Sequence, residues 1–150
     1  MSKIVIADSS CLIGLSKIGQ LKILPQLFGK IIIPEAVYHE VVIRGEGRAG
    51  AEEVKNADWI ENQKVKNELA VRAFRIHLGF GESEVIALAN ECQTDFIILD
   101  DWKARQTAEE LELPVIGTIA ILQKAVENGI IENLPTILEN LRNAGFRFLL

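Results

Sequence analysis

Residues 3–10 read KIVIADSS, a short apolar run of strand type that ends in an aspartate and two serines. Far downstream, residues 96–101 read FIILDD, a second such run that ends in two aspartates. In open α/β sheets, ligands bind just beyond the carboxyl ends of the strands. If these two strands are neighbours in a parallel sheet, Asp8, Asp100 and Asp101 emerge at the same edge. The two stretches therefore predict an α/β fold with an acidic site at that edge.

The rest of the chain alternates between short apolar strands and helical patterns. Strands are expected at residues 3–7, 31–33, 59–60, 96–99 and 114–116. Helices are expected between the first strand and Gly19, over 21–28, from Pro34, over 51–56, 66–78, 82–92 and 102–111, from Gly117-Thr118 to Gly129, and over about 134–143. Such alternation favours helices on both faces of a mostly parallel sheet. The prediction is one domain over residues 1–150, a three-layer α/β/α fold with four to five central strands.

Local side-chain patterns predict how individual helices begin and pack. Ser9 or Ser10 is expected to cap the first helix, because a hydroxyl oxygen can accept a hydrogen bond from a free backbone N–H group. In the 66–78 helix, Leu69, Ala73 and Ile76 are expected to face the core.

The composition is that of a folded globular protein. Of its 150 residues, 49% are hydrophobic and 25% are charged, which argues against intrinsic disorder. The net charge of −5 argues against a general nucleic-acid coat protein, which would be basic. It does not exclude a nuclease, whose own carboxylates would hold metal and lower the total charge.

Cysteine and histidine usage argues against disulfides and zinc. Cys11 and Cys92 are the only two cysteines, lie far apart and have apolar neighbours, so reduced thiols are expected. No Cys/His pattern has the spacing of a zinc site. The N-terminus lacks the features of a signal peptide, and no apolar run reaches the roughly 20 residues of a membrane span. A cytoplasmic protein without membrane contact is predicted.

Five acidic residues have positions that suggest a shared site. Asp8 follows the first strand, Asp100 and Asp101 follow the fourth, Glu40 lies on the third helix and Glu82 opens the central helix. Like charges in one cleft are costly unless a cation or a proton neutralises them. An all-oxygen site suits Mg²⁺ or Mn²⁺, and such ions serve phosphoryl chemistry. The set therefore predicts hydrolysis of a phosphodiester by metal-activated water.

Each of these residues also has a purely structural interpretation. Asp8 and Asp101 could be ordinary helix N-caps, each worth about 1 kcal/mol. Glu82 falls in a first helical turn, where a negative charge favours the helix dipole. Glu40 could be a solvated helix charge. The structural interpretation weakens for the set as a whole, because caps need not come from both halves of the chain.

Four motifs in order resemble the PIN domain family. They are DSS at residues 8–10, the stretch from Pro34 to Glu40, GESEVIALA at 81–89 and ILDD at 98–101. The similarity is closest to a PIN-like branch often described only as a domain of unknown function. It covers nearly the whole chain, down to AGFR at 144–147.

The resemblance implies a divalent-metal-dependent ribonuclease fold, and many members are toxins of toxin–antitoxin pairs that cut structured RNA. It assigns the metal to an acidic set: Asp8, Glu40, Glu82, and Asp100 or Asp101. It also implies that Ser10 supports Asp8 by a hydrogen bond and that Arg105 lies at the rim. The chain departs from the commoner pattern in having Glu82 for Asp and Leu99-Asp100-Asp101 for Thr-x-Asp. Strand register favours Asp101 as the match.

An acidic chain still needs cations to hold RNA phosphates. The candidates are Arg44 and Arg48 in a glycine-rich stretch, Lys103 and Arg105 after the acidic pair, and Lys64, Lys66, Arg72 and Arg75 in the middle region; most could equally form a solvated face. Trp102 could stack on a base, but packing beneath its helix is the favoured expectation. Apolar residues near the C-terminus, Phe146, Phe148, Leu149 and Leu150, suggest packing against the domain or a second copy, hence a homodimer.

The leading hypothesis is a Mg²⁺- or Mn²⁺-dependent endoribonuclease, the toxin of a toxin–antitoxin pair, with RNA as substrate and a small antitoxin as a possible partner. The alternative is a non-catalytic PIN-like module that binds RNA or a protein partner. A phosphatase or a receiver domain is disfavoured. Such a protein would need Asp-x-Asp after the first strand or a lysine at the end of a late strand, and Asp8-Ser9-Ser10 supplies neither.

Overall fold

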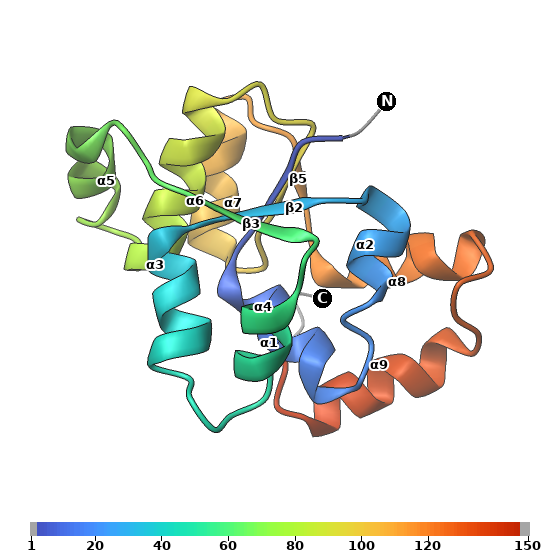
Figure 1. Ribbon diagram of the computed structural model, residues 1–150. Helices are drawn as coiled ribbons and strands as arrows, with labels where there is room; N and C mark the ends of the chain where they lie inside the picture. The colour runs from blue at the N-terminus through green and yellow to red at the C-terminus, as the bar shows by residue number, and fades with distance from the viewer. Residues whose placement is uncertain (1–2, 148–150) are drawn as a thin grey trace.

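A five-stranded parallel sheet lies at the centre of the protein (Figure 1). The computed structural model describes residues 3–147. The strands are β1 (Val5–Ala7), β2 (Ile31–Pro34), β3 (Ile60–Gln63), β4 (Phe96–Ile98) and β5 (Val115–Ile116), in the order β3-β2-β1-β4-β5. Every neighbouring pair is parallel, and β1 lies beside β4 with Ile6 opposite Ile97. The predicted adjacency of the first and fourth strands is confirmed.

Helices cover both faces of this sheet, so the predicted α/β/α arrangement is confirmed. They are α1 (Ser9–Lys17), α2 (Ile23–Phe28), α3 (Glu35–Tyr38), continued by the π-helix η1 (His39–Ile43), α4 (Ala51–Asn56), α5 (Glu68–Phe74), α6 (Phe80–Glu91), α7 (Trp102–Glu110), α8 (Thr118–Glu127) and α9 (Leu134–Asn143). Figure 1 shows α6 and α7 on one side of the strands and α2 and α8 on the other.

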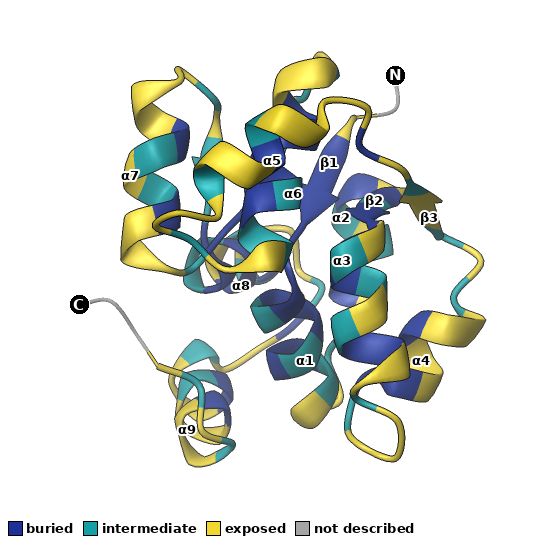
Figure 2. Ribbon diagram, turned by 90° about the vertical axis from the view of Figure 1, so that its left-hand side faces the viewer, coloured by how far each residue is buried: buried dark blue, intermediate teal, exposed yellow. Residues whose placement is uncertain are grey.

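The central strands and α6 form the core that fixes the site. All three residues of β1 are fully buried, as Figure 2 shows, and so are Ile97 and Ile98 of β4. In α6, Val85, Ile86 and Leu88 are fully buried against the sheet. Burial of each large side chain stabilises the fold by about 1.5–3 kcal/mol. The residues that directly follow β1 and β4 are therefore held on a rigid base.

The inward face predicted for the 66–78 helix is wrong. Leu69 and Ile76 are each 74% exposed, Ala73 is also exposed, and Val71 is the buried residue. Helix α5 ends at Phe74 and packs against α6 by one short face. Leu69 lies two residues from Val71, about 200° around a helix, and therefore points away from the core.

The first helical turns also differ from expectation. The N-cap residue of α1 is Asp8, so Ser9 and Ser10 lie inside the first turn instead of capping it. Pro34 ends β2 and precedes α3. Helix α6 begins at Phe80, two residues earlier than predicted, because Gly79 and not Glu82 ends the extended backbone.

The structure also bears on the expectations for the cysteines, for membrane spans and for the C-terminal apolar residues. Cys11 and Cys92 are both free thiols, as predicted. Within residues 3–147, no helix has the length and apolarity to cross a bilayer. Phe146 packs closely over Gly14, where a Cβ atom would lie 2.8 Å from the ring. The other C-terminal apolar residues of the dimer prediction, Phe148, Leu149 and Leu150, lie outside the described residues.

Candidate functional site

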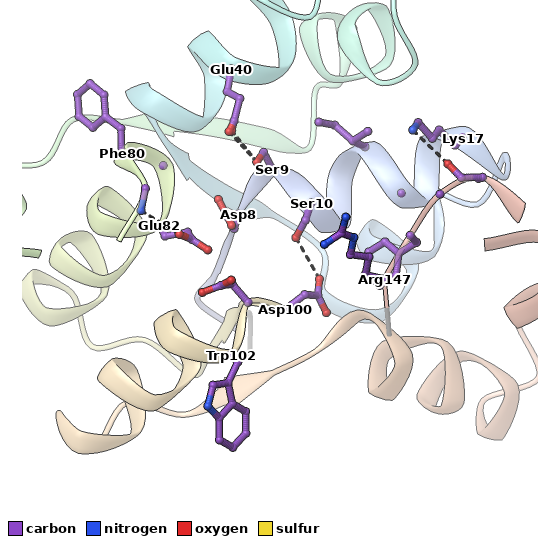
Figure 3. Close-up of a pocket in the computed structure, with 18 residues that line it drawn as sticks. Asp8, Ser9, Ser10, Lys17, Glu40, Phe80, Glu82, Asp100, Trp102 and Arg147 are labelled. Atoms are coloured by element: carbon purple, nitrogen blue, oxygen red, sulfur yellow. Dashed lines mark hydrogen bonds between the residues drawn. The ribbon is translucent and has the colours of Figure 1, made fainter. Parts of the chain in front are cut away.

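One pocket at the carboxyl edge of the sheet is lined by the five acidic side chains singled out above (Figure 3). They are Asp8 after β1, Glu40 in η1, Glu82 in the first turn of α6, and Asp100 and Asp101 after β4. Figure 3 shows the Asp8 carboxylate between those of Glu82 and Asp100. Segments from both halves of the chain thus deliver carboxylates to one place.

Asp8 is the most buried of these groups. Its side chain is 5% exposed, and its Oδ1 atom has no hydrogen-bond partner among the described residues. Burial, together with the charges of Glu82, Glu40 and Asp100, raises the pKa of Asp8 from 3.8 to about 7, against the opposing effect of a hydrogen bond from the Ser9 backbone. A buried carboxylate with one oxygen that accepts no hydrogen bond is costly unless a proton or a cation neutralises it.

Gly81 allows α6 to approach this carboxylate. A Cβ atom at residue 81 would lie 3.2 Å from Asp8 Oδ1 and 3.8 Å from Glu40 Oε1. Two carboxylate oxygens from different segments therefore lie within 4 Å of one point on the helix start. Glycine at this position leaves space beside both oxygens.

Glu40 is placed by a π-helical turn and by Ser9. Residues 39–43 form η1, and π-helical turns are rare and often found at functional sites. The Ser9 hydroxyl donates to both oxygens of Glu40, at 3.0 and 2.9 Å. Glu84 of α6 stays outside the pocket lining, where its Oε1 accepts the Ala36 N–H at 2.8 Å and fixes the start of α3.

Asp100 is held by three donated hydrogen bonds. The Thr118 hydroxyl and the Ser10 hydroxyl donate to Oδ2 at 2.7 and 3.2 Å, and the Thr118 backbone N–H donates to Oδ1 at 2.8 Å. The expectation that Ser10 supports Asp8 is wrong, because this side chain turns toward β4. Thr118 is fully buried at the start of α8 and had no predicted role. The sequence feature that could have identified Thr118 is its position two residues after β5, the strand beside β4.

Asp101 and Glu82 each use one oxygen to start a helix. Asp101 is the N-cap of α7, and its Oδ2 accepts the Ala104 N–H at 3.1 Å. Glu82 Oε1 accepts the Gly79 N–H at 3.0 Å. Burial raises the pKa of half-buried Glu82, and the charges of Asp101 and Glu40 add to that shift. The structural interpretations of Asp101 as a helix N-cap and of Glu82 as a first-turn residue are therefore correct. Both carboxylates also line the shared pocket.

A family model for the PIN domain matches residues 4–149, nearly the whole chain. The chain belongs to the PIN domain family. PIN domains are generally nucleases and usually use divalent metal ions, so a hydrolase type of activity is the family expectation. A sequence comparison with curated proteins finds no match to the chain.

The basic side chains that line the pocket of this PIN domain come from other parts of the chain than predicted. Lys17 of α1 and Arg147 line it, whereas the arginines of the glycine-rich stretch and of the middle region do not. Arg105 lies in an adjoining pocket behind Asp100, with its Nη1 atom 2.7 Å from where a Cβ of Gly117 would be. Arg105 is therefore close to Asp100 but outside the carboxylate pocket.

The donor set fits a hard divalent cation, but the described side chains do not form a finished cage. All five acidic groups offer oxygen ligands, which Mg²⁺ and Mn²⁺ prefer. Asp8 Oδ1 is buried and accepts no hydrogen bond from the described part of the chain, as expected of a ligand atom before binding. Within residues 3–147, however, no three Asp, Glu, His or Cys side chains are grouped closely enough to hold an ion as they stand. Binding of a cation would therefore require side-chain movements.

The raised pKa of Asp8 predicts a pH-dependent stability of the metal-free PIN domain. Folding raises this pKa from 3.8 to about 7, so the folded state retains a proton that the unfolded state releases between these values. The stabilising contribution is complete below pH 3.8 and lost as pH rises through about 7. We expect the urea midpoint in EDTA to fall between pH 5 and 8, and to fall less in Mn²⁺. A midpoint in EDTA that rises over this range would contradict the burial of an unneutralised carboxylate at Asp8.

Proposed function

We propose that this PIN domain is a divalent-metal-dependent endoribonuclease that acts as the toxin of a toxin–antitoxin pair. The observation that carries the nuclease proposal is the buried, unpaired Oδ1 of Asp8 among four further carboxylates in one pocket. Family membership supports nuclease chemistry. The toxin role, a small antitoxin partner and a homodimer rest on the resemblance described above and are part of the same proposal.

In this proposal Asp8, Glu40, Glu82 and Asp100, with Asp101 beside it, would hold Mg²⁺ or Mn²⁺. The bound ion would supply Lewis-acid stabilisation of the phosphate and would activate water. The protein supplies the positions. Ser9 orients Glu40, while Ser10 and Thr118 hold Asp100, so two ligands have rotamers fixed by neighbouring donors. Lys17 and Arg147 at the border of the pocket would attract the phosphate backbone.

A second candidate function, a non-catalytic module that binds RNA or a protein partner, is favoured by one observation. Glu82 is bound to the start of its own helix, and no three ligands are preassembled within the described residues. A site of this kind could hold a strand without cutting it. Calorimetric titration with Mn²⁺ separates the two candidates, because only the nuclease requires the metal.

The nuclease proposal is tested by incubating a panel of structured RNAs with the protein in Mn²⁺ and in EDTA. Glu40→Gln and Glu84→Gln form a matched pair, since both remove one charge from neighbouring elements but only Glu40 lines the pocket. We expect cleavage in Mn²⁺ alone, a loss on the order of 100-fold in Glu40→Gln and less than about threefold in Glu84→Gln. Cleavage that survives EDTA, or equal losses in both variants, would refute the proposed site.

A further inference from the structure

Two aromatic side chains stand exposed at the border of the carboxylate pocket. Phe80 is 50% exposed and Trp102 is 59% exposed, and both line the pocket that contains Asp8. The expectation that Trp102 packs beneath its helix is therefore wrong. Large aromatic side chains normally bury most of their surface, so two exposed rings at one site call for a partner.

The positions of these rings follow from the fold. Phe80 is the first residue of α6 and Trp102 is the first residue of α7. Both helices begin at the edge of the sheet where the carboxylates lie, and a side chain at a helix start has no preceding turn to pack on. Figure 3 shows the two rings on separate borders of the pocket, with Glu82 and Asp8 between them and Asp100 to one side.

The chemistry of this border matches a nucleic acid strand better than a peptide. Across the pocket, an aromatic ring is followed by the carboxylates and then by the second ring. A single nucleic acid strand presents a base, a phosphate and a second base in the same order. The Arg75 guanidinium carbon lies 4.2 Å from the centre of the Phe80 ring, which adds a cation to the aromatic border on α6. A peptide would offer no phosphate to a metal held between the two rings.

We propose that Phe80 and Trp102 are stacking platforms for the two nucleobases that flank the phosphate at the carboxylates. This inference rests on the proposed nuclease function, since it places the phosphodiester at the acidic set. A base can stack on a protein ring only when it is released from its own helix. The site therefore selects unpaired nucleotides on both sides of the phosphate, in loops, bulges or single strands.

Binding is measured by fluorescence anisotropy in Ca²⁺ with three labelled probes: a single-stranded RNA octamer, the same octamer with its two central bases removed, and the octamer in a duplex. We expect wild-type protein to bind the intact single strand about tenfold more tightly than either other probe. Phe80→Leu and Trp102→Leu should each lose part of the preference for the intact strand, and the double variant should bind the intact and the abasic strand with equal affinity. Leu69→Ala, which changes an exposed side chain outside the pocket lining, should behave like wild type.

Trp102 also provides a direct spectroscopic readout. Trp59 is the other tryptophan of the chain, so Trp59→Phe leaves Trp102 as the single reporter. Its fluorescence should be quenched by the intact strand and not by the abasic strand. An undiminished base preference in both leucine variants, or equal quenching by the two strands, would overturn the stacking role.

Parallel cleavage assays separate this inference from the proposed function. If binding depends on the bases but no cleavage occurs in Mn²⁺, the stacking role of the two rings is supported and the nuclease proposal is refuted. Cleavage that is equally fast on intact and abasic strands, and in both leucine variants, would confirm the nuclease and refute the platforms.

Discussion

Asp8→Asn is expected to reduce RNA cleavage roughly a thousandfold while making the metal-free protein more stable at pH 8. The loss of activity follows because the amide would remove the charge of the most buried of the proposed ligands. The gain in stability follows because burial raises the pKa of Asp8 to about 7, so at pH 8 the folded wild type carries an unfavourable buried charge. The shift from 3.8 sets an upper bound of about 4 kcal/mol on the gain in free energy of unfolding.

The two halves of this prediction need separate measurements. Urea unfolding in EDTA should show the variant gaining more at pH 8 than at pH 5, where the wild-type carboxyl is mostly protonated. Asp58→Asn, a change at an exposed aspartate, is the control. Its free energy of unfolding should stay within about 0.5 kcal/mol of the wild-type value at both pH 5 and pH 8. A variant that is less stable than wild type at both pH values would show that Asp8 is a structural group and not a strained ligand.

Thr118→Val is expected to weaken Mn²⁺ binding and cleavage about 10–100-fold, although Thr118 is not a candidate ligand. Valine keeps the shape of the fully buried side chain but removes the hydroxyl that donates to Asp100 Oδ2 at 2.7 Å. Asp100 would keep the bonds from Ser10 and from the backbone N–H of residue 118 but would lose the shortest of its three bonds, so its carboxylate would be held less firmly. The lost bond would also cost about 1–3 kcal/mol of stability.

Isothermal titration with Mn²⁺, at a temperature where both variants are folded, measures this effect. Thr118→Ser restores the hydroxyl and should recover most of the affinity, whereas a purely structural defect would persist. Equal Mn²⁺ affinity in the valine variant and wild type would show that Asp100 needs no orienting partner.

The sheet was predictable because its strands are read directly from the sequence. Buried parallel strands are continuous apolar runs, and residues 4–7 and 96–99 stand out for that reason. Strand ends then place Asp8 and Asp100 at one edge without any knowledge of side-chain rotamers. The short helix α5 was less predictable, because one buried residue, Val71, decides which way a two-turn helix faces.

The partners of the carboxylates could not be predicted from sequence. Ser9 and Ser10 are consecutive, and consecutive helical residues point about 100° apart, so one reaches Glu40 and the other Asp100. Those partners lie 31 and 90 residues away in the chain. Thr118 is likewise joined to Asp100 only by the pairing of β4 with β5.

If the proposed site binds a divalent cation, the unpaired oxygen of Asp8 would tie the lifetime of this protein to its metal supply. A ligand that binds only the folded state at 100 times its dissociation constant stabilises that state by about 2.7 kcal/mol. Without the ion, the strain at Asp8 stays in the folded state at neutral pH, and more chains unfold and meet proteases. Depletion of divalent cations would then lower the abundance of the protein as well as its activity.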